Sequence, residues 1–467
     1  MNLTVVILAA GLGKRMKSGL PKVLHESLGK PMLQHVIDAL KPLKPSKIVV
    51  VIGNGADEVR RRIKDDKLSF VLQKKLLGTG DALSVARKEL KKGTTLVLNG
   101  DGPLMTSGTL RKFLSKHRSS KNLVSFLSFK DESMSGYGRV IRDENKKVTG
   151  IVEDKHATPD ERKMFRELNG GVYLLETAAL NFLDRIKKNP SSGEYYITDI
   201  VELACRAGKR VDTYNCPSEE IRGVNSREQL YQVTEILKRR VISKLMEKGV
   251  TFIDPETSVV HASVSIGRDS IIYPNTYIEG TTSIGKNCVI YPGARIVDSK
   301  LGEGVVVKDS TLIEESRIGS GTSVGPFAHL RPMSLIGRNV KIGNFVEVKK
   351  STLADGTKAS HLTYLGDADV GKNVNIGAGT ITCNYDGINK FKTEIEADVF
   401  IGSDSQLVAP VKIGKGAYVA AGATVTRNVP PEALAISRKR QENLIDWVKI
   451  KKKRAESKTL KAKKNKK

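Results

Sequence analysis

An aliphatic residue returns at every sixth position over much of the C-terminal half, and this repeat limits the fold more than any other feature. The in-phase runs extend from Val260 to Ile296, from Ile318 to Val348 and from Ile395 to Val425. Small residues, often glycine, commonly follow the aliphatic one, as expected where each short strand turns a tight corner into the next. With three strands per coil, the repeat predicts a parallel β-helix with a core of stacked aliphatic side chains.

The repeat is interrupted in two places, between Val348 and Val370 and from Asn384 to Thr393. Insertions into a solenoid become loops, and such loops often lie on its binding face. We therefore expect two loops here, and we expect the chemistry of this domain to be found in them.

The N-terminal half of the chain follows a different pattern, in which short apolar runs alternate with amphipathic stretches. The runs are Leu3 to Ala10, Ile48 to Ile52, Phe70 to Leu72, Thr95 to Leu98, Leu123 to Phe129 and Gly171 to Leu175. Such alternation predicts an α/β domain of Rossmann-like type, with a mostly parallel sheet covered by helices on both faces.

Four regions follow from these patterns. Residues 1–226 form the α/β domain, and residues 227–250 form a linker helix, because their apolar residues recur at intervals of three and four. Residues 251–440 form the β-helix, and residues 441–467 form a basic tail that we expect to be disordered.

The net charge of +27 is divided between this tail and the rest of the chain. From Lys449 onward, eleven Lys or Arg against the single acid Glu456 give +10, which leaves +17 for the body. A solvated tail is the favoured interpretation, and weak attraction to nucleic acid or anionic lipid is the alternative. The body lacks the interleaved aromatic and basic residues of a single-strand nucleic-acid binder, so its charge is expected to steer phosphorylated small substrates.

The compartment is predicted from the cysteines and from the first apolar run. The four cysteines show no metal-ligand spacing and are too few for a disulfide framework. The run from Val5 to Ala10 is too short to span a bilayer, and no cleavage site follows it. We expect a cytoplasmic protein without a membrane span.

Two motifs of the α/β domain are suited to binding phosphate. The run from Leu8 to Met16 follows a strand, and its glycines allow close approach to phosphates while Lys14 and Arg15 supply charge. It is not a P-loop, because no Gly-Lys-Ser/Thr follows, and it is not a dinucleotide fingerprint, since Met16 stands where the third glycine would be. Asp101 lies just past a buried strand, where open α/β sheets bind ligands, and its carboxylate suits Mg²⁺ bridging phosphates.

Several short motifs together point to one family. They are Leu8-Ala9-Ala10-Gly11, Leu20-Pro21-Lys22-Val23-Leu24, Leu77-Gly78-Thr79-Gly80, Asn99-Gly100-Asp101, Gly136-Tyr137-Gly138-Arg139, Ile151-Val152-Glu153, Tyr195-Tyr196-Ile197-Thr198-Asp199 and Gly223-Val224-Asn225. In this order they closely resemble the sugar-1-phosphate nucleotidyltransferases. With His361 to Asp367 and Asn375 to Gly387, residues from about 3 to 440 resemble the bifunctional N-acetylglucosamine-1-phosphate uridyltransferase/glucosamine-1-phosphate acetyltransferase family.

For the N-terminal domain, the resemblance implies attack by N-acetylglucosamine-1-phosphate on the α-phosphorus of UTP, with release of pyrophosphate. It implies that uracil and ribose are held by Leu8, Ala9, Ala10, Gly11, Gln73, Gly78 and Thr79, the triphosphate by Arg15 and Lys22, the sugar by Gly138, Glu153 and Asn169, and Mg²⁺ by Asp101 and Asn225, which also belongs to the UDP-sugar site. Three residues depart from the family pattern. Asn99 stands where an aromatic is common, Asp81 where histidine is common, and Gly170 where a hydroxyl residue is usual.

For the C-terminal domain, the resemblance implies a left-handed β-helix that transfers acetyl from acetyl-CoA to glucosamine-1-phosphate. It implies that His361 is the catalytic base, that Arg331, Lys349, Tyr364, Asn375 and Lys390 bind the acceptor, and that Ala378, Asn384, Tyr385, Ser403, Ala421 and Arg438 line the acetyl-CoA groove. A base is needed because an ammonium cannot attack a thioester until it loses a proton, and imidazole can accept one near neutral pH.

The resemblance also implies a homotrimer with acetyl-transfer sites between subunits. Two alternatives remain at this stage. In one, the chain is a nucleotidyltransferase alone and the β-helix is an oligomerisation scaffold, which the segments around His361 and Asn384 argue against. In the other, the chain is a silent assembly protein, which the joint presence of Lys22, Asp101 and Asn225 argues against.

Overall fold

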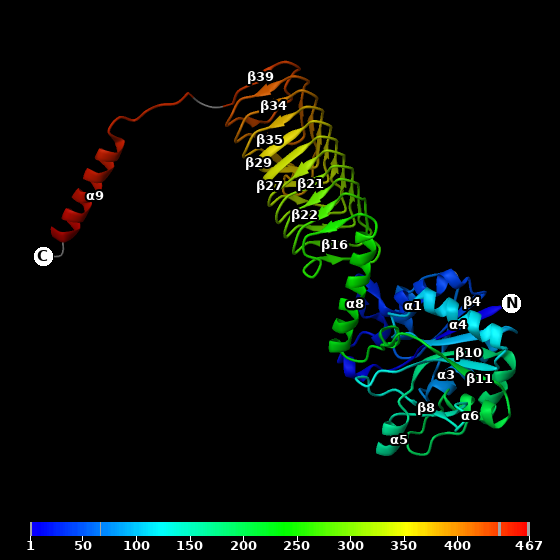
Figure 1. The fold of residues 1–467 in the computed structure, drawn as a ribbon. Helices are drawn as coiled ribbons and strands as arrows, with labels where there is room; N and C mark the ends of the chain where they lie inside the picture. The colour runs from blue at the N-terminus through cyan, green and yellow to red at the C-terminus, as the bar shows by residue number, and fades with distance from the viewer. Residues whose placement is uncertain (1, 66, 438–439, 465–467) are drawn as a thin grey trace. The chain divides into compact units, whose positions relative to one another are not determined.

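The computed structural model describes residues 2–65, 67–437 and 440–464, and α9 is described by its backbone alone beyond residue 458. The chain divides into two compact units. The first comprises residues 1–249, 254–264 and 277–280, and the second comprises residues 250–253, 265–276 and 281–467. Figure 1 shows a sheet with helices in the first unit and stacked coils in the second.

The first unit is built on a nine-stranded sheet whose main path has the order β11-β7-β10-β6-β1-β4-β5. The strands are β1 (Leu3–Ala9), β4 (Lys47–Ile52), β5 (Leu68–Leu72), β6 (Thr94–Asn99), β7 (Val124–Phe129), β8 (Arg139–Arg142), β9 (Val148–Val152), β10 (Leu168–Glu176) and β11 (Val211–Asn215). Along that path only β10 runs antiparallel to its neighbours. The sheet is therefore mostly parallel, as predicted, although β8, β9 and β11 were not foreseen.

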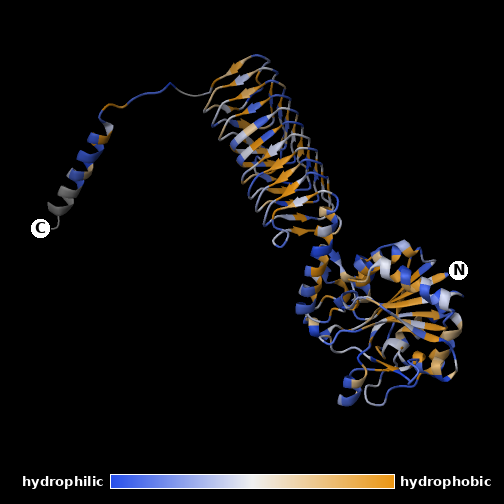
Figure 2. Cartoon of the chain, in the orientation of Figure 1, coloured by the Kyte–Doolittle hydropathy of each residue, from blue (hydrophilic) through white to orange (hydrophobic). Residues whose placement is uncertain are grey.

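Helices cover both faces of this sheet and thereby bury its strands on both sides. The helices of this unit are α1 (Met32–Leu40), α2 (Ala56–Arg62), α3 (Thr79–Ala86), α4 (Ser107–Ser120), α5 (Pro159–Met164), α6 (Asp199–Arg206), α7 (Ser218–Ile221) and α8 (Arg227–Met246). Along β1, Val5 and Ile7 pack with α1, α2 and α4, whereas Val6 packs with α3 and α6. Figure 2 shows the resulting apolar strands between more polar helices.

The predicted helix after residue 226 is α8, and it begins where the Ser226 hydroxyl accepts a hydrogen bond from the Gln229 backbone N–H at 3.2 Å. Val233, Ile236 and Leu237 of this helix are buried in a separate apolar cluster that includes Met16 and Met32. The helix thus packs on the α/β domain beside its glycine-rich turn.

The second unit contains most of a left-handed parallel β-helix, whose parallel coils the repeat predicts and whose hand the resemblance implies. The strands of the β-helix run from β12 (Thr251–Phe252) to β39 (Leu434–Ala435), and strands of successive coils pair in parallel. The register pairs Ile266 with Ile284, which is three full repeats later, but it pairs Ile284 with Leu301, which falls one position short of that spacing. A coil that is one position short has one shortened side, so the phase of the repeat slips while the coil itself stays regular.

A slip of the same kind, and not an inserted loop, explains the first interruption of the repeat, so the first of the two predicted loops was wrong. Leu353, Ala359, Leu365 and Val370 remain inward-facing and at most 2% exposed, so residues 348–370 continue the β-helix. His361 therefore lies in a strand, β29 (Lys358–Gly366), which pairs with β27 (Lys341–Lys349) and turns at Leu362, whose φ is 34°.

The second predicted loop does protrude. The register pairs Val370 with Ile395, so this coil is longer than its neighbours, and the added length lies in the segment after Asn384. The segment closes on itself, since Tyr385 and Lys390 form an antiparallel bridge and the Phe391 N–H donates to the Asn384 carbonyl at 2.8 Å.

The basic tail, which the sequence analysis expected to be disordered, contains helix α9 (Trp447–Lys464). Its lysines and alanines are good helix formers, although their like charges repel. Its described side chains, to residue 458, are all exposed. Among the residues that the structure describes, no helix is long and apolar enough to cross a membrane.

Candidate active sites

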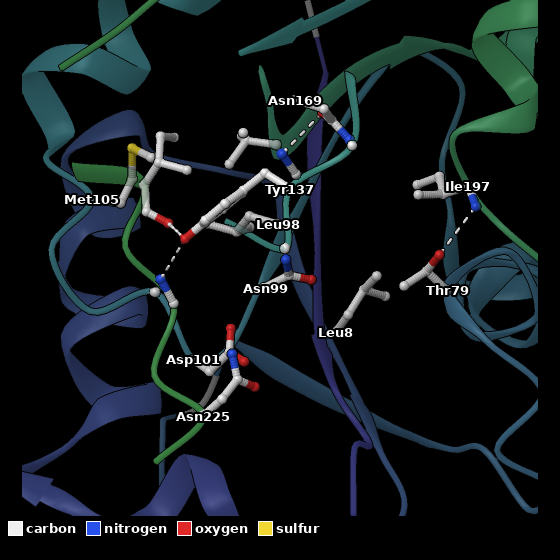
Figure 3. A pocket seen from close by; sticks show the side chains of 18 of the residues that line it. Leu8, Thr79, Leu98, Asn99, Asp101, Met105, Tyr137, Asn169, Ile197 and Asn225 are labelled. Carbon is white, nitrogen blue, oxygen red and sulfur yellow. Dashed lines mark hydrogen bonds between the residues drawn. The ribbon is translucent and has the colours of Figure 1, made fainter. Parts of the chain in front are cut away.

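Two adjoining cavities open at the carboxyl ends of β1 and β6, where an open α/β sheet is expected to bind ligands. Each has a volume of about 390 Å³. Their shared wall contains Leu8, Thr79, Asn99 and Asp101. Figure 3 shows these residues around the first cavity, with Asp101 and Asn225 side by side.

All the residues that the resemblance assigns to the N-terminal domain line these two cavities. The cavity beside the glycine-rich turn is lined by Leu8, Ala9, Ala10, Gly11, Lys22, Gln73, Gly78, Thr79 and Asp101. The other is lined by Leu8, Arg15, Thr79, Asp101, Gly138, Glu153, Asn169 and Asn225. The folded chain thus brings together residues from both ends of the domain's sequence.

The Lys22 side chain lies between Asp101 and Asn225, the two residues predicted to bind Mg²⁺. The Lys22 ammonium forms an ion pair with the Asp101 carboxylate and donates to Asn225 Oδ1 at 3.0 Å. The two oxygens therefore face one point, and that point accommodates positive charge. One carboxylate and one amide oxygen fit Mg²⁺, which commonly takes few protein ligands and completes its shell with phosphates and water.

Tyr137 fixes the segment that carries Asn225, a role that the sequence analysis did not assign to it. Its hydroxyl donates to the Ile221 carbonyl and accepts from the Gly223 N–H, both at 3.4 Å (Figure 3). Its ring packs edge-on against Phe129, with the ring centroids 5.1 Å apart. The residue lies within a motif quoted for the family, and that motif was the only available signal.

The acidic group around Glu153 is held by the start of α6. The Thr198 hydroxyl donates to Glu153 Oε1 at 2.9 Å. Burial, together with the negative charges of Glu202 and Glu153, raises the pKa of Asp199 to about 6. Asn169 is also held in place, because its Nδ2 donates to the Tyr173 hydroxyl at 2.6 Å and its Oδ1 accepts from the Gly171 N–H at 3.1 Å.

The three departures from the family pattern have structural settings. A side chain at Gly170 would meet Ile221 at 2.8 Å and the Leu127 carbonyl at 3.0 Å, so glycine fits where a hydroxyl residue is usual. The amide of Asn99 occupies the space beside Gly171. Asp81 accepts a hydrogen bond from Gln73 Nε2 at 2.7 Å.

In the β-helix, the predicted catalytic base shares one column with three of the predicted acetyl-CoA residues. His361 pairs in register with Asn344, and His361 Nδ1 lies 2.9 Å from Asn344 Oδ1. The registers Lys358↔Asn375, Asn375↔Phe400 and Phe400↔Tyr418 define the next coils. The residue three positions after each of these is His361, Ala378, Ser403 and Ala421 in turn. These four residues therefore form one column along successive coils.

Cations gather at the other end of the same face. Arg331 and Lys349 occupy successive positions in one column, next to the register pair Leu330↔Val348. The neighbouring cations, Lys390 first and then Arg331, lower the pKa of the Lys349 ammonium. Arg331 is braced by Glu347 at 2.8 Å, and Glu347 pairs in register with Tyr364. Three convergent cations suit a phosphate group.

The remaining predicted residues lie on either side of these two groups. Asn375 is on β31 (Asn375–Ile376), three residues before Ala378. Asn384 is buried and donates to Asp367 Oδ2 at 2.6 Å, whereas Tyr385 is 59% exposed on the protruding loop. Arg438 lies outside the described residues.

Comparisons with known proteins agree with both halves of the chain. A nucleotidyl transferase family model matches residues 4–219, a GMPPB C-terminal domain model matches residues 255–340, and a bacterial transferase hexapeptide model of six repeats matches residues 392–427. The crystal structure of UDP-glucose pyrophosphorylase complexed with UDP-glucose aligns with a TM-score of 0.43 and 18% identity, over 51% of this chain and 100% of that chain, which is too low to add to the assignment.

Curated relatives match over nearly the whole length. The bifunctional protein GlmU of Thermodesulfovibrio yellowstonii is 48% identical over 450 residues, which is 96% of this chain and 99% of that protein. Those of Alkaliphilus metalliredigens and Thermoanaerobacter pseudethanolicus are 46% and 48% identical, and each match covers 96% of this chain and 98% of the relative. The chain belongs to the family of the bifunctional protein GlmU.

Proposed function

We propose that this chain carries two transferase activities that together make UDP-N-acetylglucosamine. The β-helix acetylates glucosamine-1-phosphate with acetyl-CoA, and the α/β domain joins the product to the uridylyl group of UTP. The observation that carries the first assignment is the column of His361 with the predicted acetyl-CoA residues. The observation that carries the second is the pair of oxygens, from Asp101 and Asn225, that both contact the Lys22 ammonium beside the two cavities.

In uridylyl transfer, the residues act mainly by positioning and by neutralising charge. A phosphate oxygen of N-acetylglucosamine-1-phosphate attacks the α-phosphorus of UTP, the new P–O bond forms opposite the leaving group, and pyrophosphate departs. Lys22 and Arg15 neutralise the triphosphate, while Glu153 and Asn169 hold the sugar. Asp101 and Asn225 would hold Mg²⁺, which supplies Lewis acidity toward the phosphates when it is bound.

In acetyl transfer, the Asn344 contact fixes the tautomer of the catalytic base. The Asn344 carbonyl oxygen can only accept, so His361 donates from Nδ1, and its Nε2 keeps a lone pair for the substrate. Nε2 takes a proton from the glucosamine ammonium, and the free amine then attacks the thioester carbonyl. The N–C bond forms and the C–S bond breaks, the leaving sulfur takes the proton that the nitrogen loses as the amide forms, and coenzyme A departs as the thiol.

We further propose that the functional assembly is a homotrimer. His361 and the cation cluster lie toward opposite ends of one face, since His361 precedes Gly366, the register partner of Lys349, by five positions. The family resemblance supports a site that spans these two groups and is completed by residues of a second copy. A cytoplasmic location remains a prediction from the sequence.

The test is a single purified protein supplied with glucosamine-1-phosphate, acetyl-CoA, UTP and Mg²⁺, with free thiol and pyrophosphate followed separately. His361→Ala should abolish thiol release and leave pyrophosphate release from N-acetylglucosamine-1-phosphate intact. Asp101→Ala should do the reverse. The exposed residues Lys372 and Asp57 provide matched controls as alanine variants.

Pyrophosphate release without thiol release in the unaltered protein would instead support the scaffold alternative for the β-helix. Loss of both activities in either variant, with the fold retained, would contradict the assignment of one activity to each domain.

A further inference from the structure

The side-chain amide of Gln73 is locked in one orientation by this chain's own departure at position 81. Gln73 follows β5, is only 4% exposed, and lines the cavity that contains the glycine-rich turn. Its Nε2 donates to the Gly78 carbonyl at 3.1 Å and to Asp81 Oδ2 at 2.7 Å. Both amide hydrogens are therefore engaged, and Oε1 is the polar atom that remains for a ligand.

The opposite orientation of this amide is strongly disfavoured. A flip would place Oε1 against a carbonyl oxygen and a carboxylate, and both contacts would be repulsive. A carboxylate at position 81 can only accept hydrogen bonds. It therefore keeps Nε2 of Gln73, and not Oε1, turned toward itself. The histidine that is common here in the family could accept or donate, depending on its tautomer.

We propose that Asp81 is a positioning residue that makes Gln73 a fixed hydrogen-bond acceptor and thereby selects uracil over cytosine in the nucleotide. This inference rests on the proposed uridylyl transfer. Uracil has a single ring donor on its pairing edge, N3–H, and Gln73 Oε1 accepts from it. Cytosine has a lone pair at N3, so the same acceptor repels it. A site built around one such hydrogen bond discriminates strongly against an analogue that cannot form it.

The experiment compares UTP, CTP and N3-methyl-UTP as substrates, with N-acetylglucosamine-1-phosphate, Mg²⁺ and the full-length protein. Asp81→Asn leaves the shape almost unchanged but lets position 81 donate as well as accept, so only the Gly78 carbonyl still opposes a flip of the Gln73 amide. The expected result is a fall of about tenfold in the ratio of kcat/KM for UTP to that for CTP, because one charge-assisted contact orients the amide. The penalty for N3-methyl-UTP should shrink in the same variant.

Two further variants separate this role from a merely structural one. Asp184→Asn breaks the Arg87–Asp184 ion pair in the same domain at a distance from the cavity, and it should leave the UTP-to-CTP ratio unchanged. Asp81→Ala should lower the ratio as Asp81→Asn does, which guards against an effect specific to asparagine.

The outcomes distinguish this inference from the proposed function. An unchanged ratio in folded Asp81→Asn, with rates for both nucleotides lowered equally, would overturn the role of Asp81 while uridylyl transfer by the unaltered protein stands. Failure of the unaltered protein to release pyrophosphate from UTP would overturn the proposed function itself.

Discussion

Removing the Lys22 side chain should tighten the binding of Mg²⁺ to the nucleotide-free protein, although the same change should weaken catalysis. The Lys22 ammonium pairs with Asp101 and donates to Asn225 at 3.0 Å, so it occupies the two oxygens to which the ion is assigned. The Lys22 and Asp101 side chains are only 13% and 18% exposed, so water screens their attraction incompletely. A metal ion must displace this ammonium before it can bind.

The size of the effect follows from the contacts that are lost. A hydrogen bond between charged groups contributes about 1.5–3 kcal/mol, and partial exposure reduces this to about 1.4 kcal/mol, or about tenfold in affinity. Titration calorimetry with Mg²⁺ on Lys22→Met should therefore give a Kd about tenfold lower than that of the unaltered protein. Lys30→Met, which breaks the Lys30–Asp38 pair outside the two cavities, is the matched control.

Weaker or unchanged Mg²⁺ binding by Lys22→Met would refute the placement of the ion between Asp101 and Asn225. In the same variant, kcat/KM for UTP should fall, because the triphosphate loses a cation that the metal does not replace.

Three other predictions concern orientation and pH. Asn344→Ala should lower the rate of thiol release about tenfold without affecting pyrophosphate release, because His361 loses the contact that fixes its tautomer, and a parallel loss of both activities would contradict this. The pKa of Asp199 is raised to about 6, so its contribution to folding stability is lost as pH rises through 6. In thermal scans, Asp199→Asn should therefore raise Tm at pH 7.5, and this gain should shrink below pH 6. Burial lowers the pKa of His117, which contacts Ser125 and Glu176. The free energy of unfolding should therefore fall as pH drops below about 6.5. Chemical denaturation of His117→Gln should show a shallower fall.

Most of the first domain could be predicted because its signals are local. Strand β1 is a continuous apolar run that leads into a glycine-rich turn, and buried parallel strands are read directly from such runs. Strand β11 carries Asp212, Thr213 and Asn215 on a partly exposed edge, so hydropathy gave no signal for it.

The loop predicted around His361 was wrong for a specific physical reason. A change of phase in the sequence can arise from an inserted loop or from a side that is one residue short, and the pattern of aliphatic residues does not distinguish them. Leu353 and Val370 each follow the previous inward residue after five positions and remain buried, so the coil absorbs the shortening at its corners.

The sequence by itself determined the two architectures and the chemical types of the site residues, because periodicity and motifs are carried by neighbouring positions. Only the tertiary structure decided which of those residues meet. Lys22 reaches Asp101 and Asn225 across 79 and 203 positions, because the parallel strands bring distant loops to one edge of the sheet. The contact between Asp81 and Gln73 depends on the shorter turn that joins β5 to α3. In the β-helix, the lengths of the coils alone place His361 in one column with Ala378 and separate both from the cations of Arg331 and Lys349.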